Sequence, residues 1–371
     1  MKERFSVLDI FRGIFSSLVV FFHLTAFSQT PVINNDFVYN SDLFVDFFFV
    51  LSGFVITYSY QFITTGGELG KFYKKRFFRL YPLHFIVLLL FVAIELPKHF
   101  VSGYVHVNKV DNVSNNLYTF FSNAFLLNSV KLPGINDVSW NIASWSISAE
   151  MIAYLVFGLV ILAINRFGLV KIKTAVCLLV VLLAAIALRV CTGGYNLMYS
   201  FDYGFLRGIL GFFIGCICFN VFDVTKAYLR TKSDALFSAA EMLLITVTVT
   251  FVWYGHIFKS FGYIFEVLFF ITILVFAFEK GVVSHLLKRS HFLHQTGKYS
   301  YSIYMIHTFV LSMFNVLFIR LLKFPPSAYA YLFIVNYAII YFISAWTFKH
   351  IEMRFNQIPA RQKDKKAWWL W

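Results

Sequence analysis

A chain of 371 residues in which 59% are hydrophobic and only 13% are charged is too apolar for a water-soluble domain. Its mean hydropathy of +0.72 indicates a protein that crosses a lipid bilayer several times. The net charge of +14 suggests nucleic acid as one partner, but basic residues in short loops between apolar spans more often mark the cytoplasmic side of a membrane. We therefore expect the bilayer, and no nucleic acid, as the partner of this charge.

Ten apolar stretches are long enough to cross a bilayer as helices of about 18 to 23 residues. We expect them at 5–27, 42–62, 80–97, 146–165, 172–190, 201–222, 236–254, 261–279, 299–321 and 328–350. The predicted fold class is therefore all-α, a polytopic membrane protein with about ten transmembrane helices. Residues 1–355 would form one transmembrane domain, and residues 356–371 a basic cytoplasmic tail that contains tryptophan.

The distribution of Lys and Arg predicts the orientation of these spans. If the N-terminus is cytoplasmic, 23 of the 32 basic residues fall on inner segments and 7 on outer segments. The remaining two, Arg12 and Arg207, lie inside spans. Because cytoplasmic loops are enriched in Lys and Arg, both termini are predicted to be cytoplasmic, in the inner membrane of a cell.

The first span carries two polar residues that a bilayer disfavours, Arg12 and His23. They are eleven positions apart, so a helix places them about 16 Å apart along its axis and within about 20° of one face. One face would carry a cation near the cytoplasm and an imidazole near the outer surface. The alternatives are an interfacial arginine that snorkels, and a histidine that reaches outer water from the helix end.

Three other spans place ionisable groups at about the depth of His23. These are Asp46 in the second span, Glu150 in the fourth and Arg207 in the sixth. Buried ion pairs between helices, for instance Arg207 with Asp46, are one interpretation. For Glu150 and His23 we favour chemistry, because a carboxylate on one imidazole nitrogen raises the basicity of the other.

The third and ninth spans carry further candidates. Arg76 and Arg79 lie three positions apart on one helical face, a spacing at which guanidinium groups can bind phosphates, although charges beside a span usually only set topology. Ser300, Tyr304 and His307 lie on one stripe of the ninth span. A hydrogen bond between helices explains that stripe as well as catalysis does. The four cysteines show no metal or disulfide spacing, so no metal is expected.

Seven motifs follow one another along the chain: LDIFRGIFSSLVVFFH, FFFVLSGFVI, RFFRLYPLH, SWSISAE, FLRGILGFFIG, GKYSYSIYMIH and HIEMRF. They extend over almost the whole chain, from an opening Arg, ten residues and His to the last span. Together and in this order, they resemble the acyltransferase 3 family of integral membrane acyltransferases.

The resemblance implies an acyl-CoA donor, usually acetyl-CoA, and an acceptor hydroxyl on the far side of the membrane. Bacterial members O-acetylate surface polysaccharides and related glycans. Carried over by position, His23 would be the catalytic histidine and Glu150 its carboxylate, with Arg12, Arg76 and Arg79 as functional basic residues. The supporting residues would be Asp46, Trp145, Ser146, Arg207, Tyr304 and His307.

The sequence departs from the family pattern in three places. Ile10 replaces the glycine of the usual Leu-Asp-Gly opening, which would stiffen the start of the helix without affecting the chemistry. The proline that usually follows Glu-Arg is missing from HIEMRFNQIP, so no role is carried over to Glu352 and Arg354. We expect no extracytoplasmic domain after the tenth span, and we expect the transmembrane domain, residues 1–355, to complete the transfer itself.

Several alternatives remain open from the sequence. His23 would act as general base on the acceptor hydroxyl, or would carry the acyl group as an acyl-histidine. The acceptor would be the glycan, a lipid-linked sugar or a small metabolite. A secondary transporter of a small solute would also carry charges inside the membrane, although we see no repeats or paired broken spans.

Overall fold

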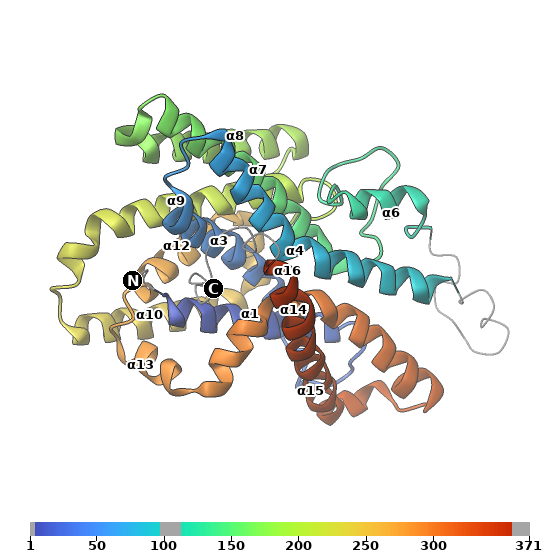
Figure 1. Ribbon diagram of the computed structural model, residues 1–371. Coiled ribbons are helices and arrows are strands. Elements are labelled where there is room, and N and C mark those ends of the chain that lie inside the picture. Colours follow the sequence, from blue (N-terminus) through green and yellow to red (C-terminus); the bar gives the residue numbers. More distant parts are fainter. Residues whose placement is uncertain (1–3, 97–112, 358–371) are drawn as a thin grey trace.

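The structure is a computed structural model that describes residues 4–96 and 113–357. Throughout these residues every regular element is a helix, which confirms the predicted all-α class (Figure 1). Nine helical stretches in this part of the chain are long and apolar enough to cross a membrane. The predicted orientation of the termini stays a prediction, and nearly all of the predicted tail, residues 358–371, lies outside the described residues.

The first half of the chain supplies five of these stretches. They are built on α1 (Ser6–Leu24), α3 (Phe44–Tyr60) preceded by α2 (Asp36–Tyr39) and η1 (Ser41–Leu43), α4 (Gly66–Glu95), α7 (Trp145–Arg166) preceded by η2 (Ile142–Ser144), and α8 (Lys173–Thr192) preceded by η3 (Leu169–Ile172). The short α6 (Leu117–Ala124) lies in the predicted outer loop and contacts α4. A capping box at Asn116 begins it, and its first residue, Leu117, is 71% exposed.

The second half supplies the other four. They are α9 (Gly204–Leu229), α10 (Asp234–Trp253), α14 (His291–Asn315) with the π-helical η5 (Val316–Leu321), and α15 (Tyr329–Thr347), which η6 (Pro326–Ala328) precedes and η7 (Phe348–Glu352) and α16 (Met353–Asn356) continue. Between α10 and α14 lie the shorter α11 (Gly255–Phe258), η4 (Lys259–Phe261), α12 (Tyr263–Phe276) and α13 (Val282–Arg289).

The start of α4 differs from the prediction. The sequence placed the third span at 80–97, but the helix begins at Gly66 and runs for 30 residues. The Oγ1 of Thr65 accepts a hydrogen bond from the backbone amide of Glu68 at 3.2 Å, and the Glu68 carboxylate caps the Thr65 amide in return. Hydropathy marks the end of a span where charged residues begin, whereas the backbone hydrogen bonds of a helix can continue past that point. The basic element with Arg76 and Arg79 is therefore part of the helix.

Glycines bring α1 and α14 into close contact. A Cβ atom on Gly13 would lie 2.4 Å from the backbone nitrogen of Gly297, so the two backbones touch at this crossing. Ten residues further along each helix, the rings of His23 and His307 are in contact, with centroids 5.0 Å apart. Equal offsets from one crossing mean that α1 and α14 run parallel, side by side over about 15 Å.

This parallel arrangement bears on the one span that is not a continuous helix. Where the sequence predicts a span at 261–279, Gly255–Phe261 and Tyr263–Phe276 form a pair bent by 100°. Successive membrane spans alternate in direction. Helices α1 and α14 can therefore run parallel only if an odd number of membrane spans lies between them. Six continuous candidates lie between them, so the parallel arrangement favours counting the bent pair as a seventh, which would bring the described residues from nine candidate spans to ten.

A second glycine crossing joins α3 to α9. A Cβ on Gly53 would lie 1.8 Å from the carbonyl oxygen of Phe212, and one on Gly215 would lie 1.9 Å from that of Val50. In lipid, where apolar burial gives little drive for association, small residues allow the backbone contact that holds helices together. The crossing places Asp46 of α3 next to Arg207 of α9.

Candidate active site

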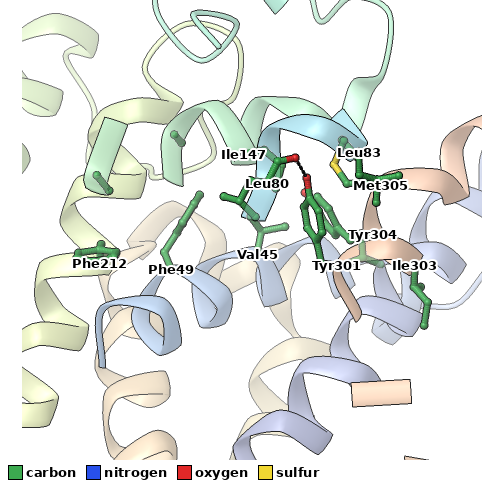
Figure 2. Packing of buried hydrophobic residues seen from close by; sticks show 14 of the residues in the cluster. Val45, Phe49, Leu80, Leu83, Ile147, Phe212, Tyr301, Ile303, Tyr304 and Met305 are labelled. Carbon is green, nitrogen blue, oxygen red and sulfur yellow. Dashed lines mark hydrogen bonds between the residues drawn. The ribbon is translucent and has the colours of Figure 1, made fainter. Parts of the chain in front are cut away.

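A cavity of about 110 Å³ lies between α1, α3, α4, α7 and α14. Its lining residues are Arg12, Ser16, Val45, Phe48, Phe49, Ser52, Val55, Ile56, Arg76, Arg79, Leu80, Ser146, Ile147, Glu150, Tyr154, Ser300, Tyr301 and Tyr304. Figure 2 shows part of this wall, with Val45, Phe49 and Ile147 among the apolar residues. The structure thus gathers six predicted site residues around one space: Arg12, Arg76, Arg79, Ser146, Glu150 and Tyr304.

Arg79 is held by a residue that sequence reasoning set aside. Its Nη1 donates to Oε2 of Glu352 at 2.6 Å, and the Glu352 side chain is completely buried. The hydroxyl of Ser302 donates to the other carboxylate oxygen. Glu352 ends the π-helical η7, and π-helical turns are frequent at functional sites. The family motif HIEMRF carried the signal for this residue, but the missing proline argued against using it.

Arg76 and Arg12 occupy different environments in the same cavity. The Nη2 of Arg76 donates to the hydroxyl of Tyr60 at 3.1 Å, and its guanidinium lies 5.1 Å from the centroid of that ring. Arg76 is buried, whereas the Arg12 side chain is 28% exposed and contacts Asp9 at 3.4 Å. The cavity is therefore lined by a buried cation, Arg76, and by a partly exposed one, Arg12.

Glu150 does not contact His23, and the pairing predicted from their depth is wrong. Oε1 of Glu150 accepts hydrogen bonds from the Ser52 hydroxyl at 2.6 Å and from the Tyr154 hydroxyl. In the part of the chain that the structure describes, no hydrogen bond or ion pair joins Glu150 to His23. Glu150 instead lines the cavity together with Arg12 and Ser16 of α1, at a level of that helix well before His23.

The side chain beside His23 is His307. Their rings lie 5.0 Å apart between centroids and are tilted by 41°. The Nδ1 of His307 lies 2.7 Å from the backbone carbonyl of Tyr304, and since a carbonyl only accepts, Nδ1 carries the proton. In the neutral ring Nε2 is then an acceptor. It is buried and has no hydrogen-bond partner among the described residues.

Tyr304 and Ser146 connect the cavity to this histidine pair. Both line the cavity, and the Ser146 hydroxyl donates to that of Tyr304 at 2.8 Å. The Tyr304 ring lies 5.9 Å from the His307 ring, measured between centroids. A continuous series of contacts therefore runs from the cavity through Tyr304 and His307 to His23.

Asp46 and Arg207 form the ion pair that the sequence allowed as an alternative. Nε and Nη2 of Arg207 donate to the two carboxylate oxygens of Asp46 at 2.6 and 2.8 Å. Both side chains are 3% exposed, and Trp145 covers the guanidinium with its ring centroid 5.3 Å away. Neither member of the pair lines the cavity. Their observed role is to hold α3 against α9, and Trp145 takes part in that contact.

Sequence reasoning missed Ser52, Tyr60, Tyr154 and Tyr301, all of which contact the predicted arginines or carboxylates or line the cavity. No pattern singles them out. In a span rich in aromatic residues, a serine or tyrosine is interpreted as a packing residue until the neighbours of its hydroxyl group are known.

Comparisons with known proteins agree with the motifs. The family model described as "Acyltransferase domain" (Acyl_transf_3) matches residues 5–345. A curated relative from Rhizobium radiobacter, "Protein 2 in picA locus", is 39% identical over 94 residues, which cover 24% of this chain and 46% of the relative. The match thus spans less than half of the length of that relative. No solved structure matches the chain.

Proposed function

Because the chain belongs to the Acyl_transf_3 family of acyltransferase domains, we propose that it is a membrane O-acetyltransferase of the cell inner membrane. It would move an acetyl group from cytoplasmic acetyl-CoA to a hydroxyl of a surface glycan, such as an O-antigen, capsule or exopolysaccharide precursor. The observation that carries this proposal is the arginine-lined cavity, which adjoins Tyr304 and, through it, the pair of His307 and His23.

The cavity suits the acyl end of the donor. Its volume of about 110 Å³ is below the roughly 300–1,000 Å³ typical of small-molecule pockets, so only the acyl group and part of the pantetheine arm would enter. The nucleotide would stay at the cytoplasmic mouth. Arg12 and Arg79, whose side chains are 28% and 21% exposed, would pair with its phosphates, and the buried Arg76 would add positive potential behind them.

His23 would act as the general base on the acceptor hydroxyl. The hydroxyl oxygen attacks the thioester carbonyl carbon, the carbon–sulfur bond breaks, and the coenzyme A thiolate takes up the proton that His23 removed. With Glu150 turned away, His307 is the polar group that would orient the imidazole. Its buried Nε2 has no hydrogen-bond partner among the described residues and would accept from an N–H of His23, which would leave the other nitrogen of His23 as the base.

A covalent route through an acyl-histidine is the competing version of this chemistry. Incubating the purified protein with labelled acetyl-CoA and no acceptor separates the two. Label retained on the protein would defeat direct transfer, whereas no label together with acceptor-dependent release of coenzyme A would support it.

The test of the proposed function has a donor arm and an acceptor arm. In the donor arm, membranes that contain the protein should bind acetyl-CoA and release free coenzyme A, and membranes without it should not. In the acceptor arm, the surface glycan of cells that express the protein should contain acetyl ester that is missing when the gene is deleted. Membranes that neither bind nor turn over acyl-CoA would overturn the proposal and favour transport of a small solute.

A further inference from the structure

Three tyrosines line the cavity, and they differ in whether the hydroxyl proton already donates a hydrogen bond within the protein. A tyrosine hydroxyl has one proton to donate. Tyr154 donates its proton to Glu150, and Tyr301 donates to the backbone carbonyl of Leu80 at 2.5 Å (Figure 2). Neither proton is available to a molecule in the cavity without breaking an existing hydrogen bond.

Tyr304 is different because its hydroxyl accepts. The Ser146 hydroxyl has two acceptors within reach, the Ala143 carbonyl at 3.1 Å and the Tyr304 hydroxyl at 2.8 Å, and the contact to Tyr304 is the shorter. Among the described residues the Tyr304 proton has no acceptor of its own. The side chain is 6% exposed and is one of those that line the cavity. A buried donor left without an acceptor is unfavourable, so a ligand that accepts from it is stabilised in the cavity.

The position of this hydroxyl is constrained from several sides. The ring packs edge-on against Phe48, with centroids 6.1 Å apart, and lies 5.9 Å from the His307 ring. Ser146 holds the hydroxyl oxygen from α7. A donor fixed in position before the reaction begins is the arrangement that stabilises charge developing in a transition state.

We propose that Tyr304 is a catalytic residue that donates its hydroxyl proton in a hydrogen bond to the carbonyl oxygen of the acyl thioester. This inference rests on the proposed function. When the acceptor oxygen bonds to the carbonyl carbon, the electron pair of the carbonyl moves to its oxygen, and the Tyr304 O–H stabilises that oxyanion. The pair returns as the carbon–sulfur bond breaks, so Tyr304 keeps its proton throughout.

Replacement of Tyr304 by phenylalanine tests this role in the purified full-length protein with acetyl-CoA and acceptor. Loss of one oxyanion donor lowers kcat by about 10²–10³-fold, so Tyr304→Phe should show a fall of that size with a KM for acetyl-CoA within about threefold of wild type. Tyr301→Phe removes a hydroxyl from the same cavity whose proton is already committed. Its kcat should fall by no more than a few-fold.

Tyr329→Phe is the matched control for the loss of a buried hydroxyl. Tyr329 donates to Asn315 at 2.8 Å, does not line the cavity, and should keep wild-type kcat while its thermal stability drops. If Tyr304→Phe keeps kcat within threefold of wild type, or loses no more than Tyr301→Phe, the oxyanion role is overturned. A wild-type protein that releases no coenzyme A would overturn the proposed function, and this proposal with it.

A second variant keeps the test decisive if Tyr304→Phe does not fold. Substituting 2,3-difluorotyrosine at position 304 retains the ring and the hydroxyl, but the phenol loses its proton more readily. Since a phenolate cannot donate, kcat should begin to fall at a lower alkaline pH than in wild type. A merely structural tyrosine would leave this pH profile unchanged, and an unchanged profile would overturn the proposal.

Discussion

Replacing Asp46 by asparagine keeps the shape of the side chain but removes the negative charge that faces Arg207. Two hydrogen bonds of 2.6 and 2.8 Å join the native pair, and both side chains are 3% exposed. Asparagine can accept only one of these bonds, and its amide turns a donor toward the second guanidinium nitrogen. Because an uncompensated charge would remain buried, we expect the free energy of unfolding to fall by about 3–5 kcal/mol.

A double variant, Asp46→Leu with Arg207→Met, replaces both charged residues by apolar ones. It separates the cost of a buried charge without a partner from the cost of lost packing. Replacing both members of a buried ion pair by apolar residues of similar volume is often neutral or stabilising, so the double variant should be more stable than Asp46→Asn. Unfolding of the purified protein in mixed micelles titrated with SDS measures these free energies. A loss below about 1 kcal/mol for Asp46→Asn, or a double variant no more stable than the single one, would refute the role given to the ion pair.

Three further predictions address the catalytic base, the donor site and a helix crossing. His23→Ala should abolish acetyl transfer and leave the amount of inserted protein unchanged, and normal turnover by this variant would remove the assigned base. Arg76→Ala with Arg79→Ala should raise the KM for acetyl-CoA more than it lowers kcat, whereas Lys74→Ala, which removes an exposed cation from the same helix, should change neither. If the two arginines only set topology, a topology reporter would show the double variant misinserted with KM unaffected in the correctly inserted fraction. Gly297→Ala would place a Cβ 2.4 Å from a backbone carbonyl oxygen of α1 and should destabilise the fold by about 1–3 kcal/mol, and an unchanged unfolding midpoint would contradict the close crossing.

Helix class and span positions were accessible from the sequence because they depend on local properties. An apolar run long enough to cross a bilayer forms a helix whatever its neighbours are, since lipid offers the backbone no other hydrogen-bond partner. The same holds for residues on one helix. The common face of Arg12 and His23, and the proximity of Arg76 to Arg79, follow from helical geometry alone. Two features escaped this reasoning: the helix ends beyond the apolar runs, as at the start of α4, and the 100° bend between Gly255–Phe261 and Tyr263–Phe276.

Contacts between helices were decided by the tertiary structure. Hydropathy places a residue at a depth but leaves open the rotation of each helix about its axis and the identity of its neighbours. The backbone contact between Gly13 and Gly297 fixes the rotation of α1 and α14 and makes them neighbours. It therefore brings His307, and not Glu150, next to His23. Local sequence determined which polar groups this protein carries into the membrane. Side-chain packing between the helices decided which of them meet.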